Sequence, residues 1–138
     1  MADLPVSFRL TIVTRERKIV ETEAVEAVLP AYDGEIGVLP GHAPLLAALR
    51  VGVMRYRMNG KAERLVLSWG FAEVLPDRVI VMAETARLPG EVDAATAEQQ
   101  RVQLERELAD LSSHDPEFAR IEARLEESVA LISLYREH

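Results

Sequence analysis

The sequence has no cysteine and no apolar run close to the roughly 20 residues that a helix needs to span a bilayer. Disulfides and thiolate metal sites are therefore excluded, and cysteine usage gives no indication of the redox compartment. Residues 1–5 show no basic start followed by an apolar run, which is the pattern of a secretory signal. We expect a cytoplasmic protein without direct membrane insertion, which meets a membrane only through another protein.

Sequence signatures of catalytic sites are also missing. There is no Gly-x-Ser-x-Gly, no phosphate-cradling Gly-Lys-Ser/Thr and no histidine pair at metal-ligand spacing. His42 has Asp33 and Glu35 nearby in sequence, which leaves an acid–base cluster as an alternative, but nothing in the sequence orients the imidazole. Trp69 and Phe71 lie in strand-like runs, so we interpret them as core or sheet-interface residues and not as a ligand platform. We predict no catalytic residue and no metal site.

The net charge of −7 is unevenly distributed along the chain. Residues 1–88 contain eleven basic and eleven acidic residues, whereas residues 89–138 contain five arginines and twelve acidic residues. The change coincides with a helix-breaking Pro-Gly dipeptide at Pro89 and Gly90. We therefore predict two domains, residues 1–88 and residues 89–138. The acidic second part argues against nucleic-acid binding, because phosphate contacts need clustered lysine and arginine.

Before this boundary, apolar and polar residues alternate in short runs, which is the period of β-strands. Asn59-Gly60 follows one run and is the strongest short-range signal for a two-residue hairpin turn, and Pro76-Asp77 marks a second turn. Many short strands with turns at close intervals predict an antiparallel β-sandwich or barrel. The runs are residues 8–12, 25–29, 54–58, 65–69, 71–75 and 78–82.

After the boundary, the apolar period changes to about 3.5 residues, which predicts helices. Asp93 is the expected N-cap of a first helix, and Asp115 caps a second helix with Pro116 at its first position. Two short helices are marginal in water, so this hairpin must pack on the sheet or on a partner. The fold class is therefore α+β, an N-terminal antiparallel β-sandwich followed by a C-terminal two-helix antiparallel hairpin. Its apolar faces are Ala97, Leu104, Leu108 and Leu111, and Phe118, Ile121, Leu125, Ser128, Ile132 and Tyr135.

One ridge of the second helix carries Arg120, Arg124, Glu127 and Leu131, and helical spacing predicts that it points away from the apolar seam. In the first interpretation, the ridge is a solvated face on which Glu117 and Glu127 compensate the two arginines. In the second, it is a contact ridge for an acidic surface of a partner.

The most informative segment is residues 34–46, which contains three glycines and two prolines around a short apolar run with no nucleophile. Glycine permits positive φ or close approach, and proline fixes φ and removes a donor. The segment therefore predicts a turn, a short strand at residues 35–39 and a second rigid turn. It is a shaped backbone and not a reaction centre.

This segment closely resembles the signature loop of the ε subunit of bacterial F-type ATP synthases. The resemblance continues in order through the strands ending near Thr85-Ala86, the helix start at Val92-Asp93 and the turn at residues 112–114. It implies a β-sandwich followed by a helical hairpin, in agreement with the pattern of the residues.

The resemblance also implies a function. The ε subunit is a non-catalytic part of the central stalk, at the cytoplasmic face of the cell inner membrane. It binds the γ subunit and the ring of membrane c subunits, and so couples ion-driven rotation to ATP synthesis. By resemblance, Asp33 and Glu35 lie towards the polar loops of the ring, and Pro40, Gly41 and His42 lie towards γ.

In this family, the hairpin can extend beside γ towards the α/β catalytic head and suppress ATP hydrolysis, and Arg120 and Arg124 are then the hypothetical regulatory ridge. Some members bind ATP at the folded hairpin through Ile/Leu-Asp-x-x-Arg-Ala. The matching residues 92–97 read Val-Asp-Ala-Ala-Thr-Ala here. Thr96 replaces the arginine and removes the charge best suited to phosphate, so we expect no bound ATP and no cofactor.

Two other functions are open at this stage. The first is a free-standing β-sandwich adaptor with a helical oligomerisation arm, which should self-associate, whereas a rotor subunit should bind γ as a monomer. The second is a small hydrolase, which would lose activity when His42 is replaced.

Overall fold

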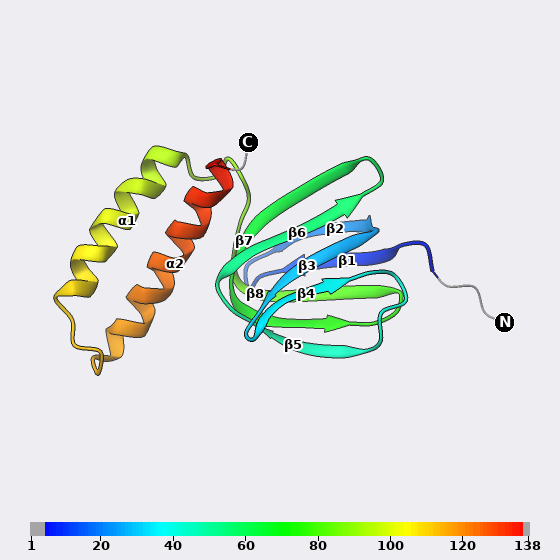
Figure 1. Ribbon diagram of the computed structural model, residues 1–138, viewed down its shortest axis with the longest axis horizontal. Coiled ribbons are helices and arrows are strands. Elements are labelled where there is room, and N and C mark those ends of the chain that lie inside the picture. Colours follow the sequence, from blue (N-terminus) through cyan, green and yellow to red (C-terminus); the bar gives the residue numbers. More distant parts are fainter. Residues whose placement is uncertain (1–4, 137–138) are drawn as a thin grey trace.

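The computed structural model describes residues 5–136, which form eight strands followed by two helices (Figure 1). The predicted α+β order is confirmed, with every strand before residue 88 and both helices after it. The strands are β1 (Phe8–Val13), β2 (Lys18–Ala24), β3 (Glu26–Ala31), β4 (Gly34–Val38), β5 (Leu45–Leu49), β6 (Gly52–Met58), β7 (Lys61–Val74) and β8 (Arg78–Arg87), and the helices are α1 (Ala94–Ala109) and α2 (Pro116–Arg136).

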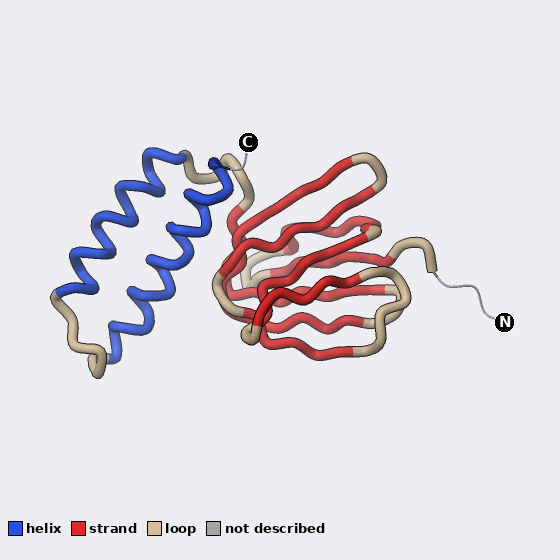
Figure 2. The backbone as a smooth tube through the Cα atoms, in the orientation of Figure 1, coloured by secondary structure: helices blue, strands red, loops and turns tan. Residues whose placement is uncertain are grey.

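The strands hydrogen-bond in the order β2-β1-β8-β7-β5-β3-β4, and β6 pairs with both β3 and β7. Strand β7 is long enough to pair with β6 along its first half and with β5 along its second half, so the sheet folds over a common core. Among residues 5–136, the paired strands run antiparallel except β1 and β8, which are parallel. In Figure 2 these strands gather into one body, and the two helices lie beside it.

The predicted β6–β7 hairpin is confirmed. Met58 pairs with Lys61 across Asn59-Gly60, and Gly60 takes a positive φ of 76°. Strand β2, in contrast, is absent from the sequence-based expectation. It carries one lysine and two glutamates, and it lies at the edge of the sheet with β1 as its ladder partner, so its alternation of apolar and polar residues is weak.

Strand β7 exchanges its faces halfway along its length. In a regular strand Leu67 and Ala72 would point to opposite sides, yet both are fully buried in the sandwich core. The change occurs at Trp69, with φ of 39°, and at Gly70, with φ of 156°. A Cβ at Gly70 would lie 2.0 Å from the Met82 carbonyl oxygen, so this close approach of two strands requires glycine.

This exchange overturns the prediction that Trp69 and Phe71 are core or sheet-interface residues. Trp69 is 40% exposed and Phe71 is 54% exposed. Beyond Gly70 the odd-numbered residues of β7 face outward, and Ala72 and Val74 fill the core in their place. The two predicted strands at residues 65–69 and 71–75 are one continuous strand.

The hairpin packs on the sandwich through α2, while α1 packs on α2 and lies farther out (Figure 1). Asp93 caps α1 as predicted, since its carboxylate accepts a hydrogen bond of 2.7 Å from the Thr96 amide. Asp115 accepts one of 2.8 Å from the Glu117 amide at the start of α2. Neither helix combines the length and apolar character that crossing a bilayer requires.

The predicted outward position of the ridge on α2 is wrong for half of its members. Leu131 is only 2% exposed and packs with Leu134 against Val66 of β7. Glu127 is bonded to β8. The helical period placed these residues on one ridge, but it contained no information about where the sandwich lies.

Candidate interaction surfaces

Residues 34–46 form the predicted turn, strand and turn, with the strand starting one residue early as β4. Gly34 opens it with φ of 131°, and Gly41 takes φ of 86° in the second turn. The Gly41 amide donates a hydrogen bond of 2.8 Å to the Pro76 carbonyl, and the His42 amide donates one of 3.1 Å to the Leu39 carbonyl. The second turn is therefore fixed on the β7–β8 turn and presents a defined backbone.

The predicted interface residues lie at opposite ends of β4. Asp33 and Glu35 are exposed at its start, and Pro40, Gly41 and His42 follow its end. A five-residue strand spans roughly 17 Å, so the two sets do not form one site. They offer two separate contact surfaces.

No acid–base cluster forms around His42. Its Nδ1 lies 2.7 Å from the Ala43 carbonyl oxygen, while Asp33 and Glu35 are at the far end of β4. The Glu35 Oε2 instead lies 3.7 Å from Arg55 Nη1. Within residues 5–136, no three histidine or carboxylate side chains are grouped so that they could hold a metal ion.

An exposed apolar patch lies on the outer face of β5, β7 and β8, and its members are Tyr32, Leu46, Trp69, Phe71 and Met82. Phe71 pairs with Met82 on one side and with Ala48 of β5 on the other, so these side chains share one face. Leu46 is 67% exposed and Met82 is 45% exposed. The Tyr32 and Trp69 rings extend the patch, with centroids 6.4 Å apart. Contiguous exposed apolar residues of this kind mark interaction sites.

The sequence interpretation missed this patch, although one signal was available. Period two places Phe71 on the same face as Glu73, and a charged residue indicates the solvent side. The exchange of faces at Gly70 hides that signal, because an uninterrupted alternation from Leu67 places Phe71 inside.

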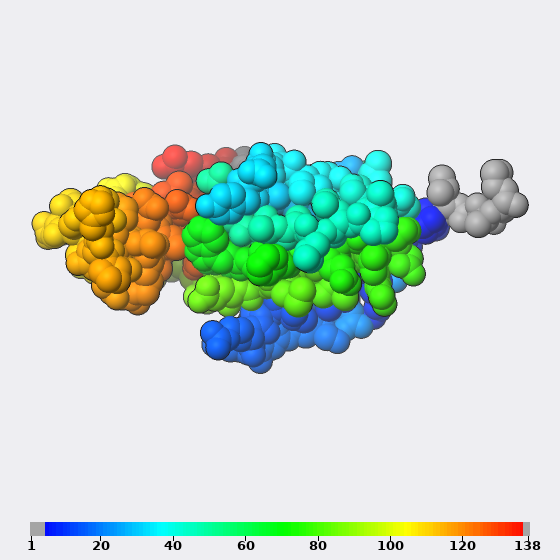
Figure 3. Space-filling model, turned by 90° about the horizontal axis from the view of Figure 1, so that it is seen from below, coloured from blue at the N-terminus to red at the C-terminus, as the bar shows by residue number. Residues whose placement is uncertain are grey.

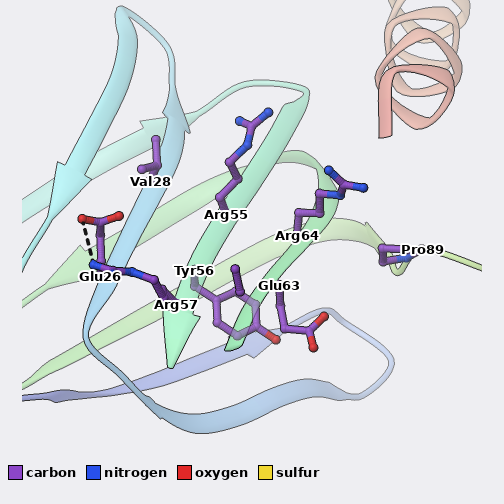
Figure 4. A pocket seen from close by; sticks show the side chains of 9 residues that line it. Glu26, Val28, Arg55, Tyr56, Arg57, Glu63, Arg64 and Pro89 are labelled. Atoms are coloured by element: carbon purple, nitrogen blue, oxygen red, sulfur yellow. Dashed lines mark ion pairs between the residues drawn. The ribbon is translucent and has the colours of Figure 1, made fainter. Parts of the chain in front are cut away.

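A shallow groove of about 540 Å³ lies over β3, β6 and β7, and Figure 4 shows three arginines around it. Arg57 lies 3.5 Å from Glu26, and Arg64 donates a hydrogen bond of 3.1 Å to the Leu134 carbonyl of α2. Arg55 faces Glu35, as described above. Each of the three guanidinium groups therefore already contacts a group of this chain, and the groove is lined by surface ion pairs and hydrogen bonds.

Arg120 and Arg124 border a second cavity, of about 690 Å³, between α2 and the outer face of β8. Arg120 forms an ion pair with Glu117, so that part of the predicted compensation is confirmed. Glu127 does not compensate the arginines, because both of its carboxylate oxygens bond to β8. In Figure 3 the hairpin occupies one end of an elongated molecule, with the sandwich beside it.

Comparison with known proteins gives a consistent result. Residues 7–89 match the family described as "ATP synthase, Delta/Epsilon chain, beta-sandwich domain". The chain is 39% identical over 126 residues to the ATP synthase epsilon chain of Syntrophobacter fumaroxidans, covering 91% of this chain and 93% of the relative. It is 42% identical over 108 residues to that of Koribacter versatilis, covering 78% of this chain and 74% of the relative.

Among solved structures, the fold is similar to a chain in the Euglena gracilis mitochondrial ATP synthase OSCP/F1/c-ring structure. The TM-score is 0.83 at 22% identity, covering 97% of this chain and 84% of that chain. A chain in the Tetrahymena thermophila mitochondrial ATP synthase central stalk/c-ring structure gives a TM-score of 0.66 at 13% identity, covering 92% and 95%. At these identities, the likeness concerns the fold.

Proposed function

This chain belongs to the ATP synthase delta/epsilon family, and from that premise we propose that it couples ion-ring rotation to ATP synthesis and restrains ATP hydrolysis through its hairpin. It is an epsilon subunit, a component of the central stalk and an accessory subunit, not the catalytic subunit. The partners that we propose are γ, the ring of c subunits and the α/β catalytic head. The complex would then hold the chain at the cytoplasmic face of the inner membrane.

The apolar patch is the observation that supports docking on γ. It is continuous with the rigid second turn, because Leu46 of β5 follows directly after residues 40–45. An interface needs a desolvated apolar centre with polar groups at its rim. Phe71 and Met82 provide that centre, and the turn at Pro40, Gly41 and His42 provides a fixed rim.

Asp33 and Glu35 support a separate contact with the ring. They are exposed at the end of β4 remote from Gly41, so both partners could bind at once. Exposed carboxylates suit a polar, charged contact, which directs orientation more than it adds affinity.

The adaptor alternative has no observation in its favour. The helices turn their buried residues towards each other and towards the sandwich, and the relatives reported above are named as ATP synthase epsilon chains. We therefore expect the isolated chain to be a monomer.

The docking proposal is tested by measuring the affinity of the purified chain for γ. Phe71→Asp should reduce the affinity at least tenfold, because it places a charge in the centre of an apolar interface. Val129→Asp is the matched control, since Val129 is a comparably exposed apolar residue on α2. Equal affinities for γ in the two variants would disprove docking through the patch.

The braking proposal is tested by truncation after Arg87, where β8 ends. Residues 1–87 should remain folded, bind γ and support ATP synthesis, while ATP hydrolysis by the assembled enzyme should rise. Arg120→Ala with Arg124→Ala should reproduce part of that rise if the ridge contacts an acidic surface on the head. If the truncated enzyme hydrolysed ATP at the wild-type rate, the braking proposal would be rejected. If hydrolysis rose in the truncation but not in the double arginine variant, only the role of the arginine ridge would be rejected.

A further inference from the structure

The hairpin holds to the sandwich through a small apolar contact. Leu131 and Leu134 of α2 pack against Val66 of β7, together with Ala97 of α1. These four side chains are buried, four partly buried apolar residues pack around them, and the sandwich core itself is a separate and much larger cluster. A contact of this size makes a modest contribution to stability, so polar bonds at its edge carry weight.

Glu127 forms such a bond at the edge nearest the hairpin tip. Its Oε1 accepts a hydrogen bond of 3.1 Å from Arg87 Nε, and its Oε2 accepts one of 3.1 Å from Thr85 Oγ1. The Glu127 side chain is 17% exposed, whereas Arg87 is 45% exposed. Both donors come from β8, so one carboxylate joins the second helix to the last strand of the sandwich. Charge-assisted hydrogen bonds that are partly removed from water are the stronger kind.

Beyond Glu127, towards the tip, the hairpin and the sheet separate. The cavity of about 690 Å³ lies between the hairpin and the sheet, lined on the hairpin side by Arg120 and Arg124 and on the sheet side by Glu84 and Trp69, and it reaches as far as Leu131. Glu127 itself borders this cavity. The carboxylate therefore stands at the boundary between the packed and the open part of the contact.

We propose that Glu127 is the latch that keeps the hairpin folded against the sandwich. Breaking its bonds to Arg87 and Thr85 leaves the apolar contact and the hydrogen bond from Arg64 to the Leu134 carbonyl, both near the end of α2, as the remaining attachment, and the hairpin tip is released. Glu127, Arg87 and Thr85 can all be hydrated when the hairpin leaves the sandwich. The latch therefore favours the folded position without preventing release. The latch concerns the isolated chain, and only its effect on hydrolysis rests on the proposed braking function.

The first experiment measures the hairpin position in the full-length chain. The sequence has no cysteine, so Asp77→Cys and Ser113→Cys give one spin label on the β7–β8 turn and one at the hairpin tip, both exposed. In this background, Glu127→Gln should increase the population at long label distances about tenfold or more, because a charge-assisted hydrogen bond is lost. Glu122→Gln is the control, with the same charge change at an exposed position of the same helix.

A second readout needs no label. Trp69 is the single tryptophan, and it lines the cavity under the hairpin. Its quenching by acrylamide should rise in Glu127→Gln and in Arg87→Gln, which removes the same bond from the sandwich side. The exchanged pair, Glu127→Arg with Arg87→Glu, should return the quenching towards the wild-type value. Distances and quenching in Glu127→Gln equal to those of Glu122→Gln would overturn the latch.

The assembled enzyme separates the latch from the brake. If a released hairpin inhibits hydrolysis, Glu127→Gln should lower the hydrolysis rate, opposite in sign to truncation. Longer label distances in Glu127→Gln with an unchanged hydrolysis rate would support the latch proposal and contradict the braking proposal. Unchanged distances would reject the latch, whatever the hydrolysis rate.

Discussion

The sandwich and the hairpin differ in where their stability originates. The sandwich surrounds its own core, in which Leu10, Leu29 and Leu67 are fully buried by strands distant in sequence. The hairpin buries few residues, and Leu131 and Leu134 do so against the sandwich. We therefore expect the sandwich to fold by itself and the hairpin to depend on its contact with the sandwich.

One of the two largest effects should come from a side chain placed where the backbones of β7 and β8 approach each other most closely. Gly70→Ala would place a Cβ 2.0 Å from the Met82 carbonyl oxygen, so β7 and β8 would have to separate. We expect a loss on the order of 3 kcal/mol in the free energy of unfolding, measured with urea. Gly37→Ala is the control, because a Cβ there meets nothing within 4 Å. A Gly70 variant as stable as the Gly37 variant would refute the strained exchange of faces.

The next effect separates the two regions directly. Leu67→Ala should destabilise the sandwich by about 2–5 kcal/mol, because it opens a cavity in a closed core. Leu131→Ala should loosen the hairpin and leave sandwich unfolding nearly unchanged. Hydrogen exchange resolved by residue measures both. If Leu131→Ala lowered protection throughout β1 and β3, the hairpin and the sandwich would be one cooperative unit.

A smaller effect is expected from acid. Hydrogen bonds from Lys18 and Arg9 lower the pKa of Glu21 on β2 from 4.5 to about 2. The hydrogen bond from the Thr96 amide lowers the pKa of Asp93 at the start of α1. A carboxyl whose pKa is lower in the folded state stabilises fully above its unfolded pKa and loses that stabilisation as the pH falls.

The Glu21 contact should therefore weaken below about pH 4.5 and be lost progressively down to about pH 2. The Asp93 contact should weaken only below about pH 3.8, the ordinary pKa of an aspartate. Glu21→Gln should flatten the pH dependence of sandwich melting, and Asp93→Asn should flatten that of the helical signal in circular dichroism. A single variant that flattened both profiles would contradict the separation of the two regions.

The smallest effect concerns ATP, for which we expect no measurable heat of binding. Thr96 lies in the first turn of α1, and its amide is already bonded to Asp93. With threonine in place of an arginine, titration of the chain with ATP in a calorimeter should show no binding at physiological concentration. Thr96→Arg is the comparison that would reveal partial recovery. A clear millimolar isotherm with the unchanged chain would show that the hairpin holds ATP without this arginine.

The sequence predicted the fold well where local signals were strong. Asn59-Gly60 fixed one hairpin, and Asp93 and Asp115 marked both helix starts. The glycines and prolines of residues 34–46 predicted the turns, since positive φ at Gly41 is a local property.

The predictions that were wrong concerned residues whose positions depend on contacts with segments distant in the chain. The direction of Glu127 and Leu131 was set by the place of the sandwich, which helical spacing does not contain. Phe71 was misplaced because the faces of β7 are exchanged at Gly70, where the Met82 carbonyl of β8 lies too close for a side chain, and the alternation of the sequence does not contain that contact. Whether the interface residues at the two ends of β4 meet the proposed partners stays a prediction.

The parallel pairing of β1 with β8 also determines when β1 can complete its hydrogen bonds as the chain is synthesised. Leu10 pairs with Val79, so an early strand waits for one of the last strands of the sandwich. At about 5–20 residues per second, the delay is roughly 3–14 s. During that interval the β1–β2 ribbon has an unfilled edge, which is a hazard for pairing with other nascent chains. Arg9, Glu21 and Glu23 place exposed charges of both signs on this ribbon, and charged side chains on an open strand edge oppose such pairing.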